Sequence, residues 1–196
     1  GQNMVGGAVQ DGDPWWNSEF AALSAIGDFD PYENACALYG ALNEQRRQPR
    51  LVGWTLTQLT DVEYEENGLV TYDRVPKDLC ERGGVVFEDL LGPDFIAFDW
   101  APDAPVLVSG NQLTVPLSYA HWSGGGVDGR VVRVSWDGAS PALWAEATLS
   151  GQPYDVVSFE LTVDVPTGDS GLLVAEVIDA DGERICANRV DVRFDR

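Results

Sequence analysis

The chain has 196 residues, of which 44% are hydrophobic, enough for one large domain or two small domains with packed cores. It carries 32 acidic and 12 basic residues, and the resulting net charge of −20 would repel nucleic acid and anionic membrane surfaces. No apolar run reaches the length that spans a membrane. The composition therefore predicts a soluble protein with neither a nucleic-acid nor a membrane partner, and it leaves the compartment open between cytoplasmic and secreted.

The first sixty residues have a strand–helix–strand pattern. Residues 14–20 predict a short buried strand. A helix is expected to begin at Asp30, which can cap it, with Pro31 at the first helical position and Glu33 completing a capping box. Residues 51–59 predict a second strand. The order strand, helix, strand is that of a βαβ unit, so the two strands are expected to be parallel.

The next thirty residues are less regular. Residues 60–74 form a polar segment rich in carboxylates, with a turn expected at Asn67-Gly68. Residues 78–91 predict a weak helix that Gly83 and Gly84 interrupt.

From about residue 95 onward, the chain alternates apolar and polar residues in short runs separated by turn signals. Asp137-Gly138 and Asp181-Gly182 are typical of hairpin turns. The pattern predicts an antiparallel β-sandwich similar to an immunoglobulin-type module, so we expect a domain boundary between residues 1–92 and 93–196. The expected strands are 95–100, 106–108, 113–119, 131–136, 143–148, 156–163, 172–178 and 184–194.

The most specific signal is the stretch WTLTQLTDVEYEENGL at residues 54–69, followed by YDRVPK at residues 72–77. These residues closely resemble the end of the catalytic barrel in glycoside hydrolase family 2, the family of β-galactosidases, β-glucuronidases and β-mannosidases. The resemblance implies a mixed fold: residues 1–92 would be the C-terminal portion of a (β/α)8 TIM barrel, followed by the immunoglobulin-like β-sandwich.

Upstream, the residues from Asn17 to Phe20 resemble the segment of this family that carries the catalytic nucleophile, with Ala21 where the family usually has glycine. The resemblance implies that Glu19 is the nucleophile of a retaining glycosidase that cleaves O-glycosidic bonds of a glycan. In such enzymes a second carboxyl group about 5 Å away protonates the leaving oxygen. The candidate substrate-binding residues are Asn17, Trp16 and Trp54, because aromatic faces suit the C–H faces of sugar rings. No cofactor and no metal are implied.

The general acid/base of this family lies in an Asn-Glu pair upstream of the nucleophile, and no such pair precedes Glu19. Asn43-Glu44 lies within the expected helix instead. The chain alone is therefore expected to be inactive. It would need the remainder of the barrel on another chain, or a homo-oligomer, as well as a carbohydrate substrate. Two alternatives are a non-catalytic carbohydrate-binding or protein-interaction β-sandwich module, and a scaffold protein that has lost the reaction.

Several weaker signals favour structural roles. The acids of residues 61–66 are expected to form a solvated or hydrogen-bonded loop rather than a cation site, with Arg74 in an ion pair beside them. Trp54 is more typical of core packing than of a sugar platform. His121 is the only histidine, and nothing near it in sequence supports a Ser-His-Asp site or a zinc cluster. Residues 179–183 echo the opening of an EF-hand loop, but a hairpin turn is favoured.

The chain contains three cysteines and no C-x-x-C pair. Their spacing gives no disulfide framework, so all three are expected to be buried thiols. They are Cys36, Cys80 and Cys186.

Overall fold

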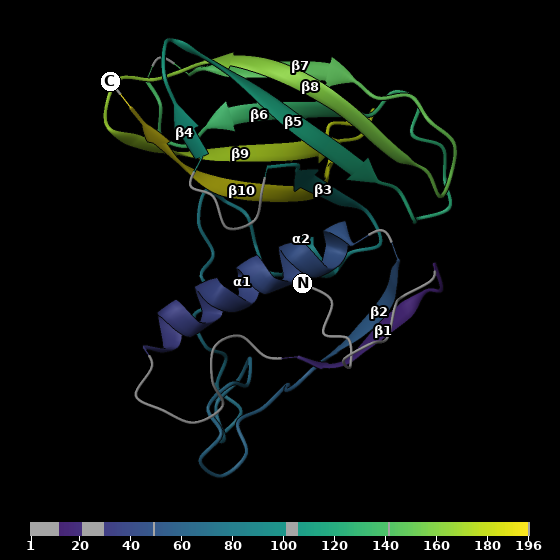
Figure 1. Cartoon of the computed structure of the whole chain (residues 1–196), viewed down its shortest axis with the longest axis vertical. Helices are drawn as coiled ribbons and strands as arrows, with labels where there is room; N and C mark the ends of the chain where they lie inside the picture. Colours follow the sequence, from purple (N-terminus) through teal and green to yellow (C-terminus); the bar gives the residue numbers. More distant parts are fainter. Residues whose placement is uncertain (1–11, 21–29, 49, 101–105, 141, 196) are drawn as a thin grey trace. The chain divides into compact units, whose positions relative to one another are not determined.

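The computed structural model of the chain describes residues 12–20, 30–48, 50–100, 106–140 and 142–195 (Figure 1). The chain forms two compact units, Gly1–Asp78 and Leu79–Arg196.

The first unit is built around one βαβ arrangement. Strand β1 (Trp15–Phe20) pairs in parallel with strand β2 (Leu51–Leu56), and helix α1 (Pro31–Arg47) connects them. The Asp30 carboxylate caps the helix by accepting the N–H groups of Tyr32 and Glu33 at 2.8 and 3.1 Å. The predicted helix and both parallel strands are confirmed, although β2 ends three residues earlier than expected. The helix residues that become buried are Ala35, Leu38, Tyr39 and Leu42.

The prediction of a TIM-barrel portion is wrong. Within the described residues the parallel sheet has only two strands, whereas a barrel closes with eight. The second βα unit also lacks its helix, because the predicted helix over 78–91 shrinks to the four residues of α2 (Glu88–Leu91). Cys80, Gly83 and Gly84 have φ angles of +60°, +61° and +71°. This left-handed backbone cannot continue an α-helix.

The second unit contains a β-sandwich of two sheets, and this part of the prediction is confirmed. One sheet has the strand order β4-β10-β9-β6-β7 and the other β3-β5-β8 (Figure 1). All pairs are antiparallel except β4 with β10, which is parallel. The strands are β3 (Phe95–Phe98), β4 (Val106–Val108), β5 (Gln112–Ala120), β6 (Val131–Trp136), β7 (Trp144–Thr148), β8 (Val156–Asp164), β9 (Ser170–Ile178) and β10 (Arg184–Phe194).

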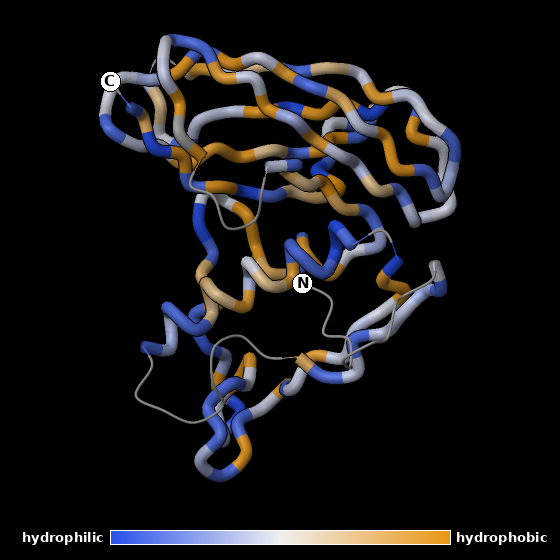
Figure 2. The backbone as a smooth tube through the Cα atoms, viewed as in Figure 1, coloured by the Kyte–Doolittle hydropathy of each residue, from blue (hydrophilic) through white to orange (hydrophobic). Residues whose placement is uncertain are grey.

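The core of the sandwich lies between the sheets and receives alternate residues from most strands. In β5, Leu113, Val115 and Leu117 are buried, while Gln112 and Thr114 between them are exposed. Figure 2 shows this alternation as orange and blue segments along the strands of the sandwich. Strand side chains point alternately to the two faces, so the period of two in the sequence places one apolar face inward.

Both predicted hairpin turns are present. Gly138 between β6 and β7 has a φ of +66°, and Gly182 between β9 and β10 has a φ of +85°. In the second turn the Asp179 carboxylate accepts the N–H groups of Asp181 and Glu183 at 3.0 and 2.8 Å. Residues 179–183 therefore form a hairpin turn, not the start of a cation-binding loop.

Candidate functional site

Glu19 lies in an irregularity at the carboxyl end of β1. Asn17 pairs with Trp54 and Phe20 pairs with Leu56, so three steps along β1 match two steps along β2. The extra residue forms a β-bulge at Ser18 and Glu19, both of which are exposed. Bulges are frequent beside active sites because they redirect a side chain out of the regular pleat. Ala21, where the resemblance departs from the family, lies outside the described residues.

The two candidate tryptophans lie on opposite faces of the two-stranded sheet. Trp16 pairs with Gly53 and Trp54 pairs with Asn17, and consecutive strand residues point to opposite sides. On its face Trp54 is partly buried, and the guanidinium of Arg46 from α1 lies 5.7 Å from the centre of its ring. Trp54 therefore packs under the helix, as its sequence context favoured.

Trp16 lies on the other face and is 57% exposed. Its indole N–H donates to the Thr55 hydroxyl at 3.2 Å. A Cβ on Gly53 would approach the Trp16 ring to 2.4 Å, so only glycine leaves room for the indole to lie across β2. Of the two tryptophans, Trp16 is thus the one that presents an aromatic surface to solvent.

The loop that follows β2 is organised by a buried ion pair. The Lys77 ammonium lies 2.7 Å from Asp61 Oδ1 and also donates to the Glu66 carbonyl at 2.8 Å. The same Asp61 oxygen accepts the Gly68 N–H at 2.9 Å. A Cβ on Gly68 would come within 2.3 Å of the Asp61 backbone nitrogen, so this contact requires glycine. The acidic loop is therefore an ordered structure held by the single lysine of the chain.

Hydrogen bonds connect this loop to the end of β1. The Thr57 N–H donates to the Phe20 carbonyl at 2.9 Å, and the Thr57 carbonyl accepts from the Asn67 amide at 2.9 Å. The Gln58 amide donates to the Asn67 side-chain oxygen at 3.2 Å. The backbone next to Glu19 is thus linked to this loop through Thr57 and Asn67.

Within the part of the chain that the structure describes, Arg74 does not form the predicted ion pair with the loop acids. The guanidinium of Arg74 donates to the Tyr72 carbonyl at 2.6 Å, and it is Lys77 that pairs with Asp61. Over the described ranges, no group of three or more His, Cys, Asp or Glu side chains is arranged to hold a metal ion.

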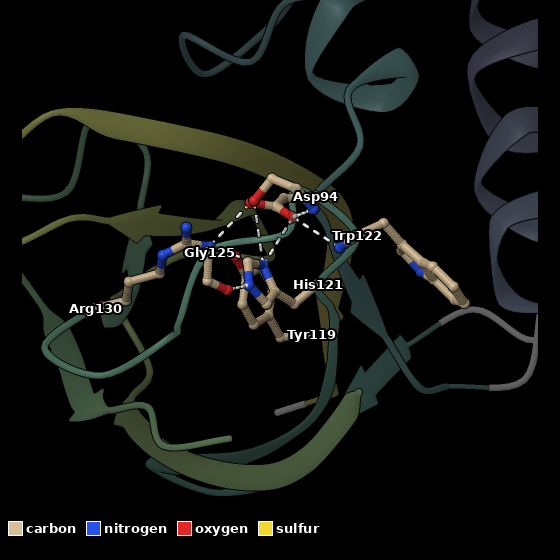
Figure 3. A network of polar contacts seen from close by, with 7 residues as sticks. Asp94, Tyr119, His121, Trp122, Gly125 and Arg130 are labelled. Carbon is tan, nitrogen blue, oxygen red and sulfur yellow. Dashed lines mark hydrogen bonds and ion pairs between the residues drawn. The ribbon is translucent and has the colours of Figure 1, made fainter. Parts of the chain in front are cut away.

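In the second unit, five hydrogen bonds converge on the buried Asp94 carboxylate (Figure 3). Oδ2 accepts from Arg130 at 2.9 Å and from the Ser123 hydroxyl at 2.8 Å. Oδ1 accepts the N–H groups of Trp122 and Ser123 at 3.0 and 3.1 Å, and lies 2.9 Å from His121 Nδ1. Asp94 therefore fixes the chain where β5 ends.

This cluster contains a serine, a histidine and an aspartate, but its geometry is not that of a catalytic triad. A triad needs the aspartate and the serine on opposite ring nitrogens of the histidine. Here Asp94 and Ser123 both face Nδ1 of His121, while Nε2 donates to the Gly125 carbonyl. His121 is also fully buried. The contacts of this cluster hold the backbone where β5 ends and make it a structural network.

The network changes the acidity of its members. Burial alone would raise the pKa of Asp94, but hydrogen bonds from Ser123, His121 and Trp122 outweigh burial and lower the pKa to about 2. Burial, together with the negative charge of Asp94, raises the pKa of Tyr119 well above its ordinary value. Burial acts to lower the pKa of Arg130, yet contact with Tyr119 and Asp94 gives a net rise. Asp94 and Arg130 are therefore a stable ion pair at ordinary pH.

The prediction of three buried thiols is correct only for Cys186, which is buried and outside any disulfide. Cys36 and Cys80 are disulfide-bonded. Neither cysteine lies in a recognisable spacing motif, which is why the sequence did not indicate that these two thiols are oxidised.

Among the residues described, no helix is both long and apolar enough to cross a membrane.

The fold of this chain is similar to parts of proteins of known structure, as the following comparisons show. No protein-family model matches the chain. No curated protein matches its sequence. Among solved structures, the exo-chitosanase CsxA of Amycolatopsis orientalis, in complex with PNP-β-D-glucosamine, is 15% identical with a TM-score of 0.51, over 85% of this chain and 19% of that one. At this identity, the likeness shows a shared fold alone.

Two further structures match less well. A β-glucuronidase of Bacteroides uniformis is 16% identical with a TM-score of 0.32, over 93% of this chain and 22% of that one. A CARDB domain from Pyrococcus furiosus is 19% identical with a TM-score of 0.38, over 52% of this chain and 91% of that one. The chain thus spans about a fifth of the length of the glycosidases that it matches. Its β-rich fold resembles part of a glycosidase.

Proposed function

We propose that these residues are part of a retaining glycoside hydrolase that cleaves O-glycosidic bonds of a glycan, and that Glu19 is its nucleophile. The observation that carries the proposal is the position of Glu19, exposed in a bulge at the carboxyl end of a parallel strand. The TQLTDVEYEENGL and YDRVPK motifs support it, as does the likeness of fold to part of an exo-chitosanase.

In the proposed reaction the Glu19 carboxylate attacks the anomeric carbon and the glycosidic C–O bond breaks. A second carboxylic acid gives its proton to the leaving oxygen, and water then hydrolyses the glycosyl–enzyme ester. The exposed indole of Trp16 suits stacking against a sugar ring. The ordered 57–77 loop supports this end of β1 through the bond from Thr57 to Phe20.

The second carboxylic acid is the part that this sequence does not identify, because no Asn-Glu pair precedes Glu19. We therefore infer that it comes from other residues of the same enzyme, from another chain or from a second copy. A carbohydrate is the substrate, and catalysis depends on that additional segment.

The test compares Glu19→Gln with Glu160→Gln in the enzyme that contains these residues. Glu160 is a matched control, because it is also an exposed glutamate on a strand. With a panel of 2,4-dinitrophenyl β-glycosides, Glu19→Gln is expected to lower kcat by about 10⁴-fold or more, while Glu160→Gln leaves it unchanged. Substantial hydrolysis by Glu19→Gln, with the same melting temperature as the parent, would remove Glu19 as the nucleophile.

A further inference from the structure

One end of the β-sandwich presents two aromatic side chains to solvent. Trp122 follows β5 and is 54% exposed, and Tyr154 precedes β8 and is 61% exposed. Their ring centres lie 6.1 Å apart, with the planes tilted by 56°. In Figure 3 the Trp122 side chain points away from the Asp94 network that holds its backbone.

The buried network fixes the backbone beneath these rings. Asp94 accepts the Trp122 N–H at 3.0 Å. The Tyr154 N–H donates to the His121 carbonyl at 2.9 Å, and the His121 N–H donates to the Asp155 carbonyl at 3.0 Å. These bonds fix the backbone of both residues, while their rings remain exposed. This end of the sandwich therefore holds two exposed rings in a defined position.

Tyr154 also has a left-handed backbone, with a φ of +68°. Non-glycine residues adopt this conformation rarely, and such outliers concentrate at ligand sites. A glycine would fit the backbone more easily but would supply no ring. The position therefore combines an unfavourable backbone with an exposed aromatic side chain.

The loop beside the rings leaves open space. A Cβ at Gly124 would lie 3.3 Å from the Tyr154 hydroxyl, so a larger residue there would press on that side chain. Cβ atoms at Gly125 and Gly126 would have no neighbour within 4 Å. The loop is therefore not packed tightly at Gly125 and Gly126.

The size and chemistry of the pair indicate the ligand. An aromatic side chain buries about 150–250 Å² at most. The surface area that two such side chains can bury is well below the roughly 800 Å² per partner that a specific protein interface buries. Trp122 and Tyr154 combine apolar ring faces with an indole N–H and a phenol, which match the C–H faces and hydroxyls of a pyranose. The net charge of −20 disfavours an anionic glycan.

We propose that Trp122 and Tyr154 form a binding site for a neutral or cationic glycan of pyranoses. This proposal does not require that Glu19 be catalytic. In an enzyme that acts on a polymer, such a site would hold the chain of the substrate without taking part in bond cleavage.

The test is isothermal titration calorimetry on the full chain with two probes, cellohexaose and the β-1,4-linked hexamer of glucosamine. Trp122→Ala and Tyr154→Ala are each expected to weaken binding about tenfold or more, which corresponds to about 1.4 kcal/mol. Tyr154→Phe keeps the ring and is expected to keep the affinity. Circular dichroism confirms that each variant is folded.

Trp144→Ala is the matched control, because Trp144 on β7 is likewise 54% exposed but stacks with the Arg133 guanidinium instead. It is expected to bind as the parent does. The proposal is overturned if neither hexasaccharide binds the parent chain. It is also overturned if Trp144→Ala weakens binding as much as Trp122→Ala does.

Discussion

Replacing Asp94 with Asn should destabilise the β-sandwich far more than removing a surface carboxylate does. The carboxylate accepts five hydrogen bonds and is 3% exposed, and its ion-pair partner Arg130 has a side chain that is 15% exposed. The Asp94→Asn variant keeps the shape of the side chain but removes its charge. It leaves the guanidinium of Arg130 buried without its counter-ion.

Loss of one partner from a buried ion pair costs about 3–5 kcal/mol. In a protein of this size each kcal/mol lowers the melting temperature by about 2–4 °C, so Asp94→Asn should lower it by about 6–20 °C. The control is Asp191→Asn, because Asp191 binds Arg82 through two bonds of 3.0 Å but has a side chain that is 65% exposed. An exposed pair contributes about 1 kcal/mol or less.

Differential scanning calorimetry of both variants, with urea unfolding as a second measure, decides between these values. If Asp94→Asn lowers the unfolding free energy no more than Asp191→Asn does, the network is not a major source of stability. The network would then not hold the backbone of Trp122 rigidly.

Because the pKa of folded Asp94 is about 2 and its ordinary value is 3.8, the carboxylate contributes about 2 kcal/mol above pH 4. This contribution should disappear as pH falls from 4 through 2; an acid titration of Asp94→Asn that matches the parent would contradict it. Gly68→Ala places a Cβ 2.3 Å from a backbone nitrogen and should cost about 1–3 kcal/mol in urea unfolding. Gly40→Ala, in α1 with no atom within 4 Å, should instead stabilise by up to about 1 kcal/mol, and equal effects of the two changes would refute this. In denaturant without reductant, Ellman's reagent should detect one thiol per chain, Cys186, and all three after reduction; three thiols before reduction would show that no disulfide forms.

The elements that depend on local physics could be predicted from the sequence. Asp30 and Pro31 define the start of α1, and the short apolar or alternating runs between turn signals from residue 95 onward mark the strands of the sandwich. Both signals lie within a few adjacent residues. The helix predicted over 78–91 does not form, and it shows the limit of this reasoning. Cys80 has a left-handed backbone that its residue type does not indicate.

The barrel prediction failed for a different reason. A βαβ pattern and a family motif identify two parallel strands, but neither specifies how many further strands join them. The Asp94 network was also not foreseeable, since its partners are between 27 and 36 positions away in sequence. The sequence did contain one signal of a special position after β5. Trp122, a large aromatic residue beside a run of glycines, lies where the alternation of β5 ends.

The catalytic claim for Glu19 is tested most directly by trapping the glycosyl–enzyme intermediate. The enzyme that contains these residues is incubated with 2,4-dinitrophenyl 2-deoxy-2-fluoro-β-glycosides of several sugars, digested and analysed by mass spectrometry. We expect the fluorosugar on the peptide that carries Glu19, and we expect Glu19→Gln to abolish the label. Release of dinitrophenolate with the sugar attached to a different residue, or with no sugar attached to the protein, would contradict it.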